Sequence, residues 1–186
     1  MIKHTRIAAL AGAAGLALVG VTAALVSQVA SAGTAGPAAA VRTPRCTARE
    51  MSAGLHGSQA LVANRGFILT LTNTSNHACS VDGYAGLKLK NAAHHRVHST
   101  THGGNTYFAA DPGPHLIVLS PGETASADFV FGAGTGGSTD SVATYLLVAP
   151  PGTSRHLTVR IPGAPVRINL GNLFVTALAR HTPYNT

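Results

Sequence analysis

The chain has no tryptophan, only two methionines and only two cysteines, and charged residues make up just 10% of its 186 positions. Acidic residues are the scarcest charged type, with six Asp and Glu against 13 Lys and Arg. The motifs GxSxG, SxxK and HExxH are absent, which removes the sequence evidence for the hydrolases that carry them. The glycine-rich stretch 132–137 is followed by no lysine, so it does not match a phosphate-binding loop.

A helical period is also missing after residue 32, and apolar residues instead recur at every second position. The clearest example is Gly66 to Asn73, where Phe67, Leu69 and Leu71 alternate with other side chains. Seven or more short strands of this kind, separated by turns, predict an all-β fold, a single Ig-like antiparallel β-sandwich. The side chains expected to form its core are Phe67, Leu69, Leu71, Leu87, Leu89, Phe129, Phe131, Leu147, Val159 and Ile161.

Glycine, proline and asparagine mark the turns between these strands. Turns are expected at 64–66, 73–76, 82–83, 120–123 and 150–152. The strand over 125–131 should be buried on one face only, with Ser126 and Asp128 on the other. Val166, Ile168 and Leu170 repeat the alternation, so all three are expected to point inward.

The N-terminus has the pattern of a signal peptide over residues 1–32. Lys3 and Arg6 precede an uncharged run, and Ala30-Ser31-Ala32 fits a cleavage site before Gly33. The alternative is an uncleaved N-terminal helix that anchors the protein, since about 20 apolar residues span a bilayer. Either outcome places the rest of the chain outside the cytoplasm, so the protein is expected to be secreted or extracytoplasmic.

Residues 33–44 are Ala, Gly, Thr and Pro in the main and predict a flexible linker. The β-sandwich domain is expected to span 45–186. Loss of Lys3 and Arg6 with the signal segment would lower the formal charge from +7 by two units. The domain would remain basic.

Cys46 and Cys79 are the only cysteines, and two cysteines in an exported chain predict a disulfide. They are not spaced as a CxxC redox pair, which favours a structural role. Closing the loop from Cys46 to Cys79 would stabilise the fold by roughly 3.5 kcal/mol in the chain-entropy treatment.

Several segments together resemble a known family: Cys46-Thr47-Ala48, LTNTSNHAC (71–79), GYAG (83–86), LSPGETASADF (119–129) and LLVAPPG (146–152). This order resembles the actinobacterial domain of unknown function 4232, a secreted or lipid-anchored β-sandwich family, over about residues 45–180. Two features depart from the family pattern. Ala85 stands where a proline is usual, and the second cysteine pair of many members is missing. The resemblance implies the fold and export, and it brings no catalytic residues.

A histidine-rich segment is the best sequence candidate for a metal site, because imidazole is a ligand for zinc, copper and nickel. Its members are His94, His95, His98 and His102. Thr, Ser and Gly surround them, which is typical of a solvated loop, and Arg96 would oppose a bound cation. An envelope metal-binding protein is therefore the second interpretation of function, and an unrecognised hydrolase is the third.

The first interpretation of function, a binding module, depends on two groups of cations. One is Lys88, Lys90 and Arg96, and the other is Arg42, Arg45 and Arg49. The first group alternates away from the core and could contact an anionic envelope polymer, a lipid surface or an envelope protein. Tyr84, Tyr107 and Tyr184 are the aromatic side chains expected to be exposed. The sequence thus predicts a non-catalytic exported interaction module without a cofactor, and nucleic acid is not an expected partner outside the cytoplasm.

Cleavage after Ala32 is directly testable. Secreted protein should have an intact mass corresponding to a chain that starts at Gly33, because the Ala-Ser-Ala pattern ends there. Recovery of a membrane-bound form that retains residues 1–32 would contradict cleavage and support the uncleaved anchor.

Overall fold

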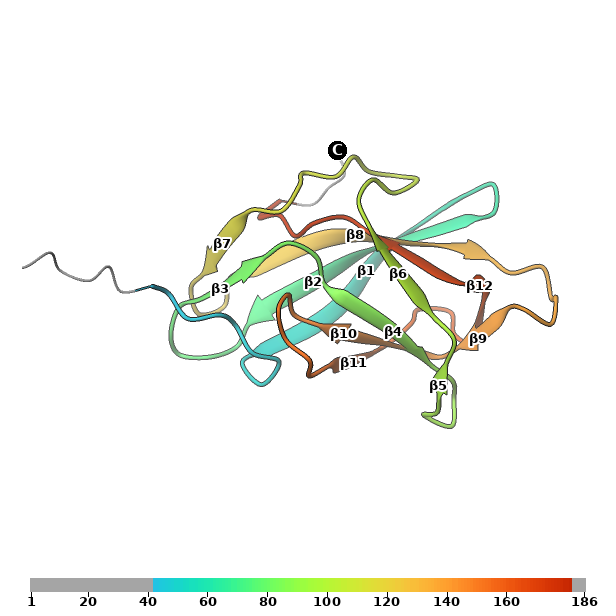
Figure 1. The fold of residues 1–186 in the computed structure, drawn as a ribbon, viewed down its shortest axis with the longest axis horizontal. Coiled ribbons are helices and arrows are strands. Elements are labelled where there is room, and N and C mark those ends of the chain that lie inside the picture. The colour runs from blue at the N-terminus through green and yellow to red at the C-terminus, as the bar shows by residue number, and fades with distance from the viewer. Residues whose placement is uncertain (1–41, 182–186) are drawn as a thin grey trace, which may run out of the picture. The chain divides into compact units, whose positions relative to one another are not determined.

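The computed structural model describes residues 42–181, which form twelve strands and no helix (Figure 1). The expected signal segment and Tyr184 lie outside the described residues. Within the described range no helix is long and apolar enough to cross a membrane. The strands are β1 (Met51–Leu61), β2 (Asn64–Asn73), β3 (Cys79–Asp82), β4 (Gly86–Lys90), β5 (Arg96–Val97), β6 (Thr100–Gly103), β7 (Leu116–Leu119), β8 (Thr124–Ala133), β9 (Ser141–Ala143), β10 (Tyr145–Ala149), β11 (Leu157–Arg160) and β12 (Val166–Val175).

The strands form a large sheet of order β1-β2-β8-β12-β6, with β9 also on β12, and a four-stranded sheet of order β11-β10-β4-β5. β3 and β7 form a separate two-stranded ribbon. Figure 1 shows the β11-β10-β4-β5 sheet in front of the large one, as in a sandwich. The predicted all-β sandwich is confirmed. Its pairings are antiparallel except that β6 runs parallel to β12.

The core lies between the sheets and centres on β2 and β8. These strands pair in continuous register from Asn64 with Gly132 to Thr72 with Thr124. The rings of Phe67, Phe129 and Phe131 pack together, with centroids 5.8 to 6.4 Å apart. Eight of the ten expected core side chains belong to one buried cluster: Phe67, Leu69, Leu71, Leu87, Leu89, Phe129, Phe131 and Ile161.

The other two expected core residues lie differently. Leu147 is buried, but it pairs with Lys88 and lies on the opposite face from its core-facing neighbours Leu146 and Val148. The prediction took the wrong face because β10 is apolar on both. Val159 is only half-buried, because β11 is an edge strand with one neighbour.

The outer face of β8 is covered, which contradicts the expected one-sided strand. Ser126, Asp128 and Val130 are all buried. Segment 104–115 lies over this face, where Thr106 donates a hydrogen bond to Asp128. The C-terminal segment adds two backbone bonds of 2.8 Å between Ser126 and Ala179. The polar residues on this strand therefore hold covering segments instead of facing solvent.

Two local predictions fail where non-glycine residues adopt left-handed backbone. The turn expected at 64–66 is absent, since Asn64 already belongs to β2, and the chain reverses at Val62 with φ of 54°. Leu170 has φ of 51° and is 48% exposed, because the pairing of β12 with β8 shifts between Ile168 and Leu173. Alternation cannot reveal either irregularity.

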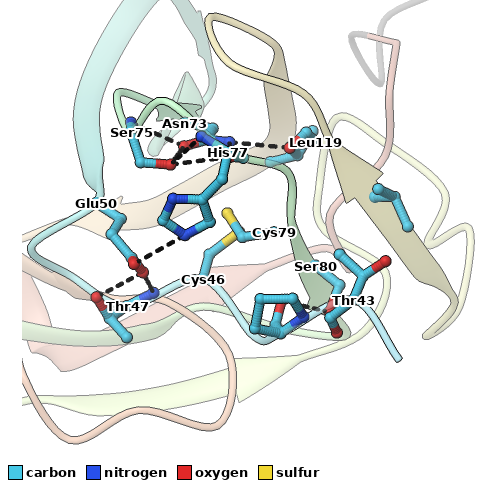
Figure 2. Close-up of a disulfide and its surroundings, with 12 residues drawn as sticks. Thr43, Cys46, Thr47, Glu50, Asn73, Ser75, His77, Cys79, Ser80 and Leu119 are labelled. Carbon is cyan, nitrogen blue, oxygen red and sulfur yellow. Dashed lines mark hydrogen bonds and ion pairs between the residues drawn. A yellow bond between two sulfur atoms is a disulfide. The ribbon is translucent and has the colours of Figure 1, made fainter. Parts of the chain in front are cut away.

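The N-terminal segment is fastened to β3 by the disulfide between Cys46 and Cys79, whose Cα atoms are 4.9 Å apart (Figure 2). The predicted disulfide is confirmed. Ser80 donates hydrogen bonds to the carbonyls of Thr43 and Pro44, so the last residues of the expected linker are attached to the domain.

Asn73 ends β2 as predicted, and its side chain ties three segments together (Figure 2). The amide nitrogen donates to the carbonyls of His77 and Leu119, at 2.8 and 2.9 Å. The amide oxygen accepts hydrogen bonds from the backbone and hydroxyl groups of Ser75. Such a turn forms because Asn bonds readily to nearby backbone groups.

Replacing Phe129 with alanine should lower the free energy of unfolding by about 3–5 kcal/mol, and Leu71→Ala by about 2–5 kcal/mol. Both side chains are 0% exposed, so each change leaves a cavity in the core. Chemical denaturation followed by circular dichroism measures the loss. Leu116→Ala is the control, since Leu116 is 66% exposed and its loss should change stability by no more than about 0.5 kcal/mol. Equal losses in both classes would contradict this core.

Candidate ligand-binding face

Four cations lie on the outer face of the β11-β10-β4-β5 sheet. Residues paired across antiparallel strands share a face, and one such row runs Arg160, Tyr145, Lys90 and Arg96. Lys88 lies on the same face, two residues before Lys90. We call Lys88, Lys90, Arg96 and Arg160 the cationic face.

The cationic face follows from simple alternation on β4. Leu87 and Leu89 are buried in the core cluster, so Lys88 and Lys90 between and after them must point outward. Lys88 is exposed and Lys90 is half-buried. No Asp or Glu occurs in β4, β5, β10 or β11. The ion pairs His77–Glu50 and Arg180–Glu123 involve other residues.

His156 reports the electrostatics of this face. Its pKa is lowered from the ordinary value of 6.5, first by burial and then by the positive charges of Arg96, Lys88 and Lys90. Both causes disfavour the imidazolium form. Because the three cations act on one imidazole, the positive charge is concentrated and is not offset by nearby carboxylates.

A shallow depression in the cationic face lies next to His156. Lys88 and Arg96 border it, and hydroxyl side chains from Thr100 and Ser154 complete its rim. Further along the face, the His94 ring stacks on Tyr145 with centroids 4.4 Å apart. The face therefore offers cations, hydroxyl donors and a flat ring surface, a combination suited to an anionic ligand.

The structure brings together the three predicted residues Lys88, Lys90 and Arg96. Sequence reasoning missed Arg160, His156 and the ring pair of His94 with Tyr145. Arg160 alternates outward on β11 as Lys88 does on β4, so its direction was visible in the sequence. That β11 and β4 are both neighbours of β10 was not visible, because strand order depends on long-range pairing.

The second predicted cluster makes different contacts. Arg45 forms a bridge to Ser80 beside the disulfide, and its guanidinium lies against Gly152. Arg42 and Arg49 are exposed. Arg45 thus helps to attach the segment before β1 to β3.

The four histidines of the proposed metal site are not brought together. His94 stacks on Tyr145, while His102 stacks on Phe174 and its Nε2 lies 3.1 Å from the Asn172 side-chain oxygen. His95 and His98 are exposed. Within residues 42–181 no group of three His, Cys, Asp or Glu side chains is placed to hold a metal ion.

Five of the six Asp and Glu side chains have close partners, in separate places. Asp111 accepts a hydrogen bond of 2.5 Å from Tyr84, which raises the pKa of that tyrosine. Tyr84 is half-buried, not exposed as expected, whereas Tyr107 is 52% exposed. The other contacts are Thr106 to Asp128, Thr47 to Glu50, Ser120 to Glu123 and Gly136 to Asp140.

Two of these carboxylates, Glu50 and Glu123, accept hydrogen bonds within turns, and these bonds lower their pKa. For Glu50 the largest cause is the Thr47 backbone N–H, with smaller contributions from the Thr47 hydroxyl and His77. For Glu123 it is the Ser120 backbone N–H, followed by Arg180. These groups close turns, and neither lies on β4, β5, β10 or β11.

Comparison with known proteins gives one family. Residues 46–179 match the family described as Domain of unknown function (DUF4232). No curated protein and no solved structure matches the chain. The match covers most of the chain and nearly the whole of the described domain, from the first disulfide cysteine to the segment that covers β8. The chain therefore belongs to the family of unknown function DUF4232.

Proposed function

We propose that this domain is a non-catalytic binding module that acts outside the cytoplasm and holds an anionic polymer of the cell envelope on its cationic face. The observation that carries the proposal is the gathering of Lys88, Lys90, Arg96 and Arg160 on one sheet face whose strands contain no carboxylate. The sheet holds these side chains in fixed rows.

Like charges on this face repel one another. Lys90 and Arg96 are directly opposite across β4 and β5, an arrangement that destabilises a sheet by a few tenths of a kcal/mol or more. The free domain bears this cost without a compensating carboxylate on these strands. A bound polyanion would relieve the repulsion, so part of its binding energy comes from the protein itself.

The length of the row favours a polymer over a small ion. Four adjacent strands spaced about 4.8 Å apart spread the row of Arg160, Tyr145, Lys90 and Arg96 over roughly 14 Å. A small anion would contact one or two of these groups. A chain of anionic groups can contact all of them, and linked contacts strengthen one another.

An extracytoplasmic location is supported by two features. The Cys46–Cys79 disulfide is of the kind that persists in oxidising compartments. The N-terminal sequence has the pattern of a signal peptide. Anionic wall polymers and anionic lipids are both present at such a location, and the shared chemistry is a surface of repeated negative charges.

The binding test uses two probes, long-chain polyphosphate and vesicles that contain phosphatidylglycerol. The variant K88Q/K90Q/R96Q should bind either probe on the order of 100-fold more weakly, because each cation near an anionic surface contributes about 1 kcal/mol. Wild-type binding should weaken steeply between low and physiological salt. Adding R160Q should weaken it further.

The matched control is R42Q/R45Q/R49Q, which removes the same charge from the other cluster. It should retain most of the binding. If both triple variants lose binding equally, the attraction depends only on net charge and the cationic face is not a site. No retention of the wild type at low salt would remove the proposal.

His156 provides an independent measurement. Its pKa should lie below 6.5 in the free domain and rise toward 6.5 in K88Q/K90Q/R96Q, without reaching it, because burial remains. A bound polyanion should likewise raise the pKa, since negative charge favours imidazolium. Polyanion binding should therefore strengthen as pH falls through the His156 titration. An NMR titration assigned with H156N measures these shifts, and a pKa that the triple variant leaves unchanged would contradict the assigned electrostatics.

A further inference from the structure

A second concave site lies near the start of β2. It is a cavity of about 520 Å³ between β2 and β8 on one side and the turn that precedes β12 on the other. A volume of this size suits one small ligand. Two arginines, Arg65 and Arg167, border the cavity, and no Asp or Glu does.

Arg65 occupies a core-facing position in the register. It pairs with Phe131, which is 1% exposed in the core, and it precedes the core residue Phe67 by two positions. Paired residues share a face, so the Arg65 side chain leaves the sheet on the core side and borders the cavity. Arg65 is nevertheless exposed, because it lies at the start of β2 on the rim of the cavity.

Arg65 forms no ion pair with a carboxylate in the part of the chain that the structure describes. A guanidinium group at the rim of the cavity remains accessible to an anionic ligand. Its planar fork of donors matches the two oxygens of a carboxylate and the oxygens of a sulfonate or phosphate.

Apolar side chains form much of the remaining lining of the cavity, and Ser58 adds a polar group. Phe67 and Phe131 form its floor, and Pro162, Pro165 and Val166 contribute to its walls. Val166 is half-buried and packs against the core cluster, so this wall is part of the folded structure. These surfaces can hold a ring or a short hydrocarbon next to the guanidinium.

We propose that this cavity binds a small amphiphilic anion, a compound with a ring-sized apolar body and one carboxylate, sulfonate or phosphate group that pairs with Arg65. The apolar body occupies the space between Phe131 and Val166, and the acid group lies at the mouth. None of the four residues of the cationic face lines the cavity, although Arg160 donates a hydrogen bond to the Ala164 carbonyl in the turn beside it. A ligand here would also stabilise the folded domain, because binding to the folded state alone raises stability.

A matched pair of fluorescent probes tests the proposal. 1-Anilinonaphthalene-8-sulfonate carries a sulfonate, and N-phenyl-1-naphthylamine has the same ring skeleton without it. The purified chain should bind the sulfonate probe saturably at one site, and 2-naphthoate should compete. Arg65→Gln should weaken the sulfonate probe at least tenfold and leave the uncharged probe within about twofold, because only the ion pair is lost.

Three further variants locate the effect. Arg49→Gln removes one exposed charge before β1 and should leave both probes unchanged. Val166→Trp fills the cavity and should block both probes while the circular-dichroism spectrum stays that of the folded chain. K88Q/K90Q/R96Q should leave the sulfonate probe bound.

Three results would overturn the site. The first is unaltered binding of the sulfonate probe in Arg65→Gln, and the second is an equal loss of that binding in Arg65→Gln and Arg49→Gln. The third is non-saturable binding of the probe, which would show nonspecific adsorption only. Loss of the probe in K88Q/K90Q/R96Q would move the anion to the cationic face, and so would overturn this inference without affecting the proposed function.

Discussion

The pairing of β2 with β8 is the contact on which the rest of the domain depends. It continues without a shift from Asn64 with Gly132 to Thr72 with Thr124, although the partners lie 52 residues apart at its far end. This register sets Phe67 beside Phe129 and Arg65 beside Phe131. A slip by one residue would turn every core side chain outward, so the packed phenylalanine rings and the register maintain each other.

The two sheets treat their outer faces in opposite ways. The outer face of β8 is closed by segment 104–115 and by the C-terminal segment, which bonds to Ser126. The outer face of the four-stranded sheet carries the cationic face, where Lys88, Arg96 and Arg160 are exposed and Leu147 is buried. A sandwich needs only its inner faces for stability, so an uncovered outer face is free to carry a binding function.

Covalent and polar contacts then secure the ends of the chain. The disulfide joins the N-terminal segment to β3, and Asn73 links the end of β2 to the carbonyls of His77 and Leu119 (Figure 2). These contacts lie at one end of the domain, and the cavity beside Arg65 lies where β2 begins. The disulfide and the Asn73 contacts thus lie near the end of β2, and the small-anion site is proposed near its start.

Local chemistry along the chain was enough to predict the all-β class, most of the core, the disulfide, the turns at 120–123 and 150–152, and the outward direction of Lys88 and Lys90. Each of these depends on a two-residue period or on the preferences of Pro, Gly, Asn and Cys. Tertiary structure alone decided which polar strand face is exposed. Asp128 on β8 and Lys88 on β4 alternate with buried neighbours in the same way, yet Asp128 is buried and Lys88 is exposed. The difference arises because covering segments and strand order come from contacts between residues far apart in sequence, which alternation does not record.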